Sequence, residues 1–224
     1  MADGANGVDA TDGGSAGPLA FTASLDANGN ALWTRETVGP NTVNTGDGVA
    51  LAVDPTNEAV QIENWGTSGA DADGGSTFAR NRMLEKTAAS GADAWATSNP
   101  LLNAGWFPSY AGWDGGGAWG GLAVDATGNV FLAGNFEGAL ELGATGQLTS
   151  AGSLDIDVLV LDPSGAVTLS ARWGTADAEF ASGMALDATG HPVIGGWSIP
   201  ASAAGPTSSA ISSPYKLFVA KLGW

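Results

Sequence analysis

The sequence contains no cysteine, which excludes disulfide bonds and thiolate metal sites. Histidine occurs once, as His191, and a single histidine without cysteine cannot build a zinc site. Basic residues are scarce: 7 Lys and Arg face 23 Asp and Glu, for a formal net charge of -16. Such a surface repels phosphate backbones and anionic lipids, so we expect no nucleic-acid partner. No run approaches the roughly 18 apolar residues of a membrane helix, so we expect no membrane span.

The composition that remains is that of a turn-rich globular protein. Hydrophobic residues make up 44% of the 224 residues, enough to build a core. The 35 glycines have no triplet period, which excludes collagen and indicates many turns. The acidity has two interpretations that both stay open. It keeps a repetitive protein soluble, or it attracts cations and leaves neutral sugars as partners.

Self-similarity along the chain predicts the fold. Residues 51–57, 122–128 and 184–190 align without gaps, and each has an apolar run, an aspartate and a closing Gly or Asn. Residues 21–29 and 158–165 form a second element of the same kind, which alternates with the first. A degenerate further copy is expected at 78–84, closed by Ser90, Gly91 and Trp95. A repeat of this length, with no helical period, is typical of stacked β units.

Each copy carries the chemistry of a tight hairpin turn. Aspartate at the first position accepts backbone N–H bonds, and Pro55 and Pro163 sit where the turn requires φ near −65°. Gly or Asn at the fourth position adopts the left-handed conformation that lets the strands pair again. We therefore assign a structural turn role to Asp26, Asp54, Asp125, Asp162 and Asp187.

Two hairpins per unit give four strands, which is the content of one propeller blade. One four-stranded sheet cannot bury both of its faces, so neighbouring copies must stack. The fold expected is all-β: a β-propeller of repeated four-stranded antiparallel blades, partial or open, with about 3–4 blades. The hairpins count to half a blade, two blades and three-quarters of another. This count fits a portion of a propeller, or a ring in which the N-terminal strand closes the last blade.

Several motifs resemble the bacterial SBBP repeat, a β-propeller repeat of surface and secreted proteins. The matching motifs are Ala-Val-Asp at 123–125, Gly-Asn-Val-Phe at 128–131, Leu-Thr-Ser-Ala-Gly at 148–152, the segment 157–162, and Leu-Phe-Val-Ala-Lys-Leu at 217–222. The resemblance covers residues 17–64 and 118–222 well, and 65–117 poorly. It implies a propeller fold and an extracellular or cell-surface setting in a bacterium, and it assigns no reaction.

The domain organisation follows from these patterns. Residues 1–18 form a Gly- and Asp-rich N-terminal segment, and 19–224 form the repeat domain. Within that domain, 65–117 is an irregular insertion rich in aromatic residues and glycine. Long insertions on repeat scaffolds are common places for binding faces. Tryptophan can stack on sugars, which predicts ligand-binding roles for Trp106, Tyr110, Trp113 and Trp119. The alternative is that these aromatic side chains are buried between blades.

Calcium is the candidate metal, and no other cofactor is expected. Asp71 and Asp73 place carboxylates on a glycine-rich turn, which suits an ion that prefers oxygen ligands. The motif lacks the distal glutamate of an EF-hand loop. Catalytic patterns are weaker still, because no Gly-x-Ser-x-Gly elbow is present. A carboxylate-dependent hydrolase remains as an alternative, with acidic candidates at Asp155, Asp157, Asp177 and Glu179.

The function expected is a non-enzymatic extracellular or cell-surface module for binding or display, with carbohydrate as the first ligand to test. The alternatives are a purely structural repeat of a larger surface protein and, third, the hydrolase. The expected partners are a glycan or another surface protein. Self-association through the open ends of the repeat is a further expectation.

Overall fold

The computed structural model describes residues 20–37, 46–70, 76–97, 121–142, 146–152, 154–200 and 216–223. These residues form fifteen β-strands in five antiparallel sheets. The expected all-β class is therefore confirmed. No helix long and apolar enough to cross a membrane occurs among the described residues. No sheet in the same residues closes on itself.

The sheets follow the order of the chain. The first pairs β1 (Ala20–Leu25) with β2 (Ala31–Thr37). The second has the order β3 (Gly46–Val53), β4 (Ala59–Ala70), β5 (Ser76–Thr87), β6 (Asp93–Thr97). The third has the order β7 (Gly121–Val124), β8 (Val130–Phe136), β11 (Asp155–Leu161), β12 (Val167–Trp173). The last has the order β13 (Ala178–Leu186), β14 (Pro192–Ile199), β15 (Lys216–Lys221). A small hairpin, β9 (Ala139–Glu141) with β10 (Gln147–Thr149), lies between β8 and β11 in the chain.

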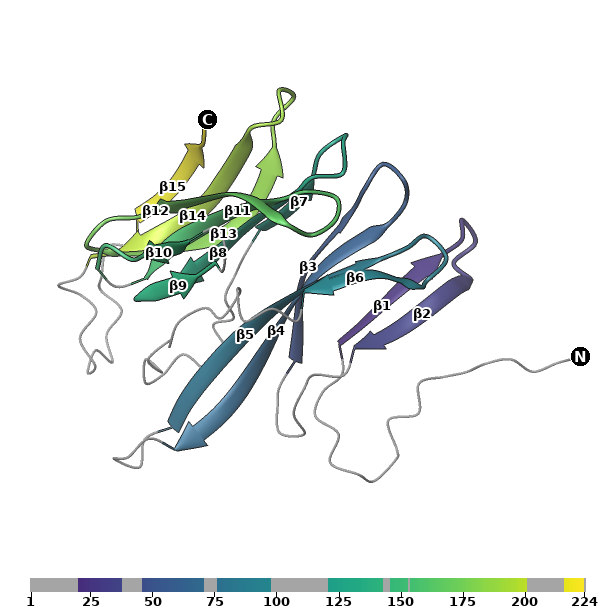
Figure 1. Ribbon diagram of the computed structural model, residues 1–224, viewed down its shortest axis with the longest axis horizontal. Coiled ribbons are helices and arrows are strands. Elements are labelled where there is room, and N and C mark those ends of the chain that lie inside the picture. Colours follow the sequence, from purple (N-terminus) through teal and green to yellow (C-terminus); the bar gives the residue numbers. More distant parts are fainter. Residues whose placement is uncertain are drawn as a thin grey trace, which may run out of the picture.

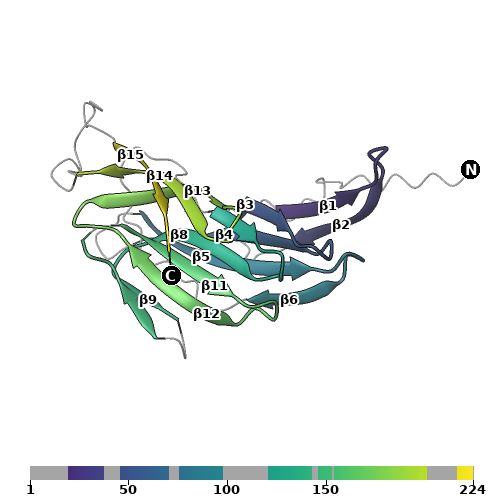
Figure 2. The same ribbon diagram turned by 90° about the horizontal axis from the view of Figure 1, so that it is seen from above.

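The four larger units stack one behind the other (Figures 1 and 2). The hairpin β1–β2 lies at one end of the stack and β13–β15 at the other. Neighbouring units meet through their first strands: β7 contacts β3 on one side and β13 on the other, and β1 contacts β3. The strand numbers along the stack are 2, 4, 4 and 3, the same numbers as in the hairpin count from the sequence.

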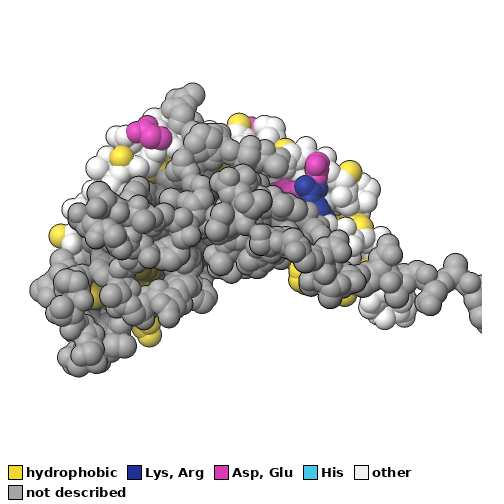
Figure 3. Space-filling model, turned by 90° about the horizontal axis from the view of Figure 1, so that it is seen from below, with side chains coloured by type: hydrophobic (Ala, Val, Ile, Leu, Met, Phe, Trp, Pro, Cys, Tyr) yellow, Lys and Arg dark blue, Asp and Glu magenta, His cyan; other side chains and the backbone are white. Residues whose placement is uncertain are grey.

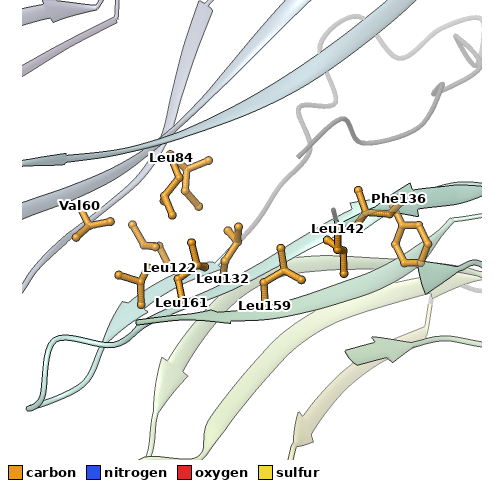
Figure 4. Close-up of a cluster of buried hydrophobic side chains, with 11 residues drawn as sticks. Val60, Leu84, Leu122, Leu132, Phe136, Leu142, Leu159 and Leu161 are labelled. Atoms are coloured by element: carbon orange, nitrogen blue, oxygen red, sulfur yellow. The ribbon is translucent and has the colours of Figure 1, made fainter. Parts of the chain in front are cut away.

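The larger core fills the space between the second and third sheets (Figure 4). Val60 and Ile62 of β4 and Leu84 of β5 contribute from the second sheet. The third sheet contributes residues that alternate along β8 and β11, because successive side chains of a strand point to opposite faces. Those residues are Val130, Leu132, Leu159 and Leu161, with Leu122 of β7, Phe136 at the end of β8, and Leu140 and Leu142 of the β9 region beside them.

A second core lies on the opposite face of the third sheet. It is formed by Ala133 of β8 and by Ile156 and Val158 of β11, which alternate with the residues of the first core. Ala181 and Ile194 cover them from the last sheet. The third sheet is thus apolar on both faces, and β11 is buried along its whole length, Asp155–Leu161.

Within the segment 65–117, the described residues 65–70 and 76–97 are more regular than their composition suggests. Residues 65–70 continue β4, and 76–97 contain β5, a turn and β6. The degenerate hairpin expected there is therefore present, with β5 starting at Ser76. Closure of the last sheet by the N-terminal strand does not occur in the described residues, since β15 pairs only with β14 and β1 pairs only with β2.

Candidate functional site

Five hairpin turns carry an aspartate at the head and share one backbone geometry. The aspartate N–H donates to the carbonyl four residues later, and the N–H of the fourth turn residue donates to the aspartate carbonyl. The fourth residue has a φ of 64° at Asn57 and between 82° and 87° at the glycines of the other four turns. This is the three-residue hairpin loop in which a type I turn ends in a left-handed residue.

The aspartate side chain completes each turn in the same way. Its Oδ1 atom accepts N–H bonds of 2.8–3.1 Å from the residues two and four places later. In four turns a hydroxyl two places later donates to Oδ1 as well, from Thr56, Thr127, Ser164 and Thr189. These bonds favour the charged carboxylate. At Asp26 the side-chain amide of Asn30 also donates to Oδ2, and together with the backbone N–H bonds it holds the pKa of Asp26 below its usual value.

One of these aspartates also binds a buried cation. Lys86 of β5 has a side chain only 5% exposed, and its Nζ lies 2.9 Å from Asp54 Oδ2 and 2.7 Å from Glu58 Oε2. Burial acts to raise the pKa of Asp54, but hydrogen bonds from Thr56 and Lys86 outweigh it and lower that pKa far below its usual range. Burial likewise acts to lower the pKa of Lys86, and its bonds to the two carboxylates raise it instead.

Two tryptophans, on the last strands of the first and second sheets, bind a turn of the next sheet, a role that the sequence analysis missed. Trp33 Nε1 of β2 donates to Ala89 O at 3.1 Å. Trp95 Nε1 of β6 donates to Pro163 O at 2.9 Å. The two acceptors hold the same place, the second residue of the turn between third and fourth strands. The signal was available in the sequence, because each tryptophan lies seven residues after its own turn head, Asp26 or Ala88.

The turns of the second and third sheets border a groove of about 200 Å³. It is lined by Asp54, Pro55, Thr56, Glu58, Lys86, Ala126, Thr127, Gly128 and Pro163. This volume is below the usual size of a ligand pocket. Because Asp54 and Glu58 already bind Lys86, the groove offers polar side chains to a small neutral molecule. No sequence signal marks it, since its walls come from two separate turns and Pro163 of a third.

Of the four acidic residues proposed for a hydrolase, Asp155, Asp157 and Glu179 are buried and Asp177 is half-buried. Asp155 is fully buried; its Oδ2 accepts bonds from Arg172 Nη1 at 2.6 Å and from Ala151 N–H at 2.8 Å. Glu179 is 3% exposed and accepts bonds from the Thr175 N–H and hydroxyl. Asp157 is also fully buried. Such positions favour structural roles for these carboxylates, because a hydrolytic pair needs access to substrate and water.

The remaining predicted site residues lie outside the described residues. These are the aromatic candidates Trp106, Tyr110, Trp113 and Trp119 and the calcium candidates Asp71 and Asp73. Within the described ranges, no three His, Asp or Glu side chains gather in a way that suits a metal ion. On the face seen in Figure 3, the basic side chains of the described residues gather at one place, next to acidic ones.

Neither a protein-family model nor a curated protein matches this chain. The resemblance to the SBBP repeat therefore stays a prediction, supported by its own motifs.

Proposed function

We propose that the protein is a β-propeller-type repeat module that binds or displays ligands outside a bacterial cell and carries out no reaction. The observation that carries this proposal is the stack itself: four antiparallel units that face one another and meet through their first strands. Successive blades of a propeller have this relation. The buried, bonded state of Asp155 and Glu179 supports a scaffold over a hydrolase.

Carbohydrate is the ligand class we propose first. The aromatic segment around Trp106 and Trp113 supplies flat apolar rings with polar edges, and the acidic surface disfavours anionic ligands. The groove beside Thr127 is the competing site, because the exposed turn residue Thr127 borders it and its carboxylates form ion pairs with Lys86. A purely structural repeat of a larger surface protein is the second candidate, favoured by the consumption of every turn aspartate in turn hydrogen bonds.

The test is a glycan array followed by titration of intrinsic tryptophan fluorescence with each hit. Binding should be lost in W106A or W113A and kept in W33F, whose ring contacts a turn instead. Loss of binding in T127R, with W106A unaffected, would move the site to the groove. An array with no hits and fluorescence unchanged by sugars would contradict the carbohydrate proposal and favour the structural repeat.

A further inference from the structure

The pairing registers within each sheet show which residues of successive sheets occupy equivalent positions. The second strand of each sheet follows an aspartate turn, and the residue seven places after the turn head faces one residue of the third strand. These facing pairs are Gln61 with Glu85, Leu132 with Leu159, and Ile194 with Ala220. The residue before each third-strand member is therefore also equivalent: Leu84, Val158 and Val219. We call the face that carries these three residues the forward face of each sheet.

The forward face is covered in the second and third sheets and open in the last. Leu84 and Val158 are fully buried, because each packs against the following sheet. Val219 at the same place is 78% exposed. Leu217, which corresponds to the fully buried Ile156, is 85% exposed. The last sheet thus presents a surface that, in the second and third sheets, is covered by the following sheet.

Aromatic rings extend the open forward face. Phe180 of β13 and Trp197 of β14 lie opposite each other and stack with ring centroids 3.9 Å apart. Trp197 also lies opposite Leu217, so cross-strand pairing places all three on one face. The alternating residue Phe218 points the other way, where it packs against the second core. Phe180 and Trp197 are half-buried, and with the exposed Leu217 and Val219 they form one apolar surface, a feature typical of interaction sites.

The opposite end of the stack is open on the other face. Leu161 directly precedes its turn aspartate and is buried against the preceding sheet. Leu25 precedes Asp26 in the same way, yet it is 58% exposed, and Phe21 on its face is 73% exposed. The alternating Thr22 is 8% exposed and points inward. We call the face with Leu25 and Leu161 the backward face.

Most of the exposed large hydrophobic side chains lie on the two end sheets. Among the described residues, the large hydrophobic side chains that are exposed are Phe21, Leu25, Leu32, Leu51, Val53, Leu217 and Val219. The first three lie on β1–β2, and the last two on β15. Leu51 and Val53 lie on β3, on the N-terminal side of the stack, where the first sheet has only two strands to cover them.

We propose that a second copy of this chain covers the open forward face with its β1–β2 hairpin, so that copies associate head to tail. Inside the chain, every forward face packs on the backward face of the next sheet, and the proposed contact continues that interface. The two open faces lie at opposite ends of the stack, which separates them within one copy (Figures 1 and 2). The contact joins two different surfaces, so it builds a ring or an open chain of copies.

The test uses the full chain and two face variants. V219D places a charge on the forward face and leaves the backward face intact, and L25D does the reverse. By light scattering and sedimentation across a dilution series, the wild-type chain should associate and each variant should be monomeric. An equimolar mixture of V219D and L25D should recover a dimer with one copy of each. A139D, an exposed residue of β9 away from both faces, is the matched control and should associate like the wild type.

Several outcomes would overturn the proposal. A wild-type chain that is monomeric at every concentration leaves the forward face to a different protein or to another part of the chain. Dimers of L25D alone, or of V219D alone, indicate contact between like faces. A mixture that stays monomeric contradicts the pairing of unlike faces. If circular dichroism shows that V219D is unfolded, L217D tests the same face.

Discussion

The turn between β3 and β4 and the turn between β5 and β6 share a backbone and differ at their head residue. Asp54 begins the first and Ala88 the second. In both, the head N–H donates to the carbonyl four residues later, and the fourth residue has a positive φ, 64° at Asn57 and 86° at Gly91. At Ala88 the carboxylate bonds are missing, and only a 3.5 Å contact from Ala92 N–H to Ser90 Oγ replaces them. The left-handed residue therefore sets the turn, and aspartate adds stability and a charge to it.

The largest expected effect comes from removing the charge that binds Lys86. D54A leaves the buried ammonium with Glu58 alone and also removes the side-chain oxygen that accepts the N–H bonds of Thr56 and Glu58. We expect a loss of about 3 kcal/mol in the free energy of unfolding. Urea unfolding measures it, with D125A as the control that removes the same turn bonds without a lysine and costs about 1 kcal/mol. Equal losses in the two variants would show that the ion pair adds nothing.

The same ion pair predicts a pH dependence. The pKa of Asp54 is lowered on folding, so its contribution is complete above the unfolded value of 3.8. It is lost progressively as the pH falls below that value toward the folded pKa. The pKa of Lys86 is raised, so its contribution is complete below 10.5 and is lost as the pH rises beyond that. Between pH 2 and 7, the free energy of unfolding should change less with pH in D54A than in D125A. Equal changes in the two variants would contradict this assignment.

A smaller effect is expected at the contact between sheets. Trp95 packs on Gly165 and donates to Pro163 O, and the equivalent place on β12 holds Leu169, which contacts no such turn within the described residues. We expect W95L to lower the free energy of unfolding by about 1–2 kcal/mol, from the lost hydrogen bond and ring contact. L169I, at the equivalent position, is the control and should cost less. If W95L unfolds at the wild-type urea concentration, the tryptophan does not link the sheets.

The smallest effect is a gain. A88D introduces the missing acceptor into a turn whose backbone already has the required geometry, so Ser90 and Ala92 N–H groups obtain a carboxylate partner. We expect stabilisation by about 0.5–1 kcal/mol, seen as a higher thermal midpoint. A88N separates hydrogen bonding from charge and should recover part of the gain. A lower midpoint in A88D would mean that the turn differs from the other five.

The repeated hairpin turns could be predicted from the sequence, whereas the features that do not repeat were found only in the structure. Asp-x-x-Gly spacing is a local signal that fixes hairpin turns, and counting hairpins predicts the strand numbers of the stack. The β5–β6 turn was harder to recognise, because its head residue is Ala88, and only Ser90, Gly91 and Trp95 marked it. The hairpin β9–β10 was not expected, since its strands are three residues each and lack the aspartate turn.

Contacts between sheets were out of reach for a different reason. Trp33 and Trp95 recur seven residues after their turn heads, but this spacing does not identify their acceptors, Ala89 and Pro163, which lie 56 and 68 residues further along the chain. The open ends follow the same logic. Val219 and Val158 belong to similar apolar strands, and only the stacking order shows that one is covered and the other is exposed.

Amide hydrogen exchange on the full chain tests the stacked arrangement most directly. The third sheet is covered on both faces, so amides of β8 and β11 should exchange slowest of all the described strands. Amides of β1 and β15, at the two ends, should exchange faster by orders of magnitude in a monomeric variant such as V219D. Fast exchange across 130–136 and 155–161, or protection equal at the ends and in the middle, would contradict the stack.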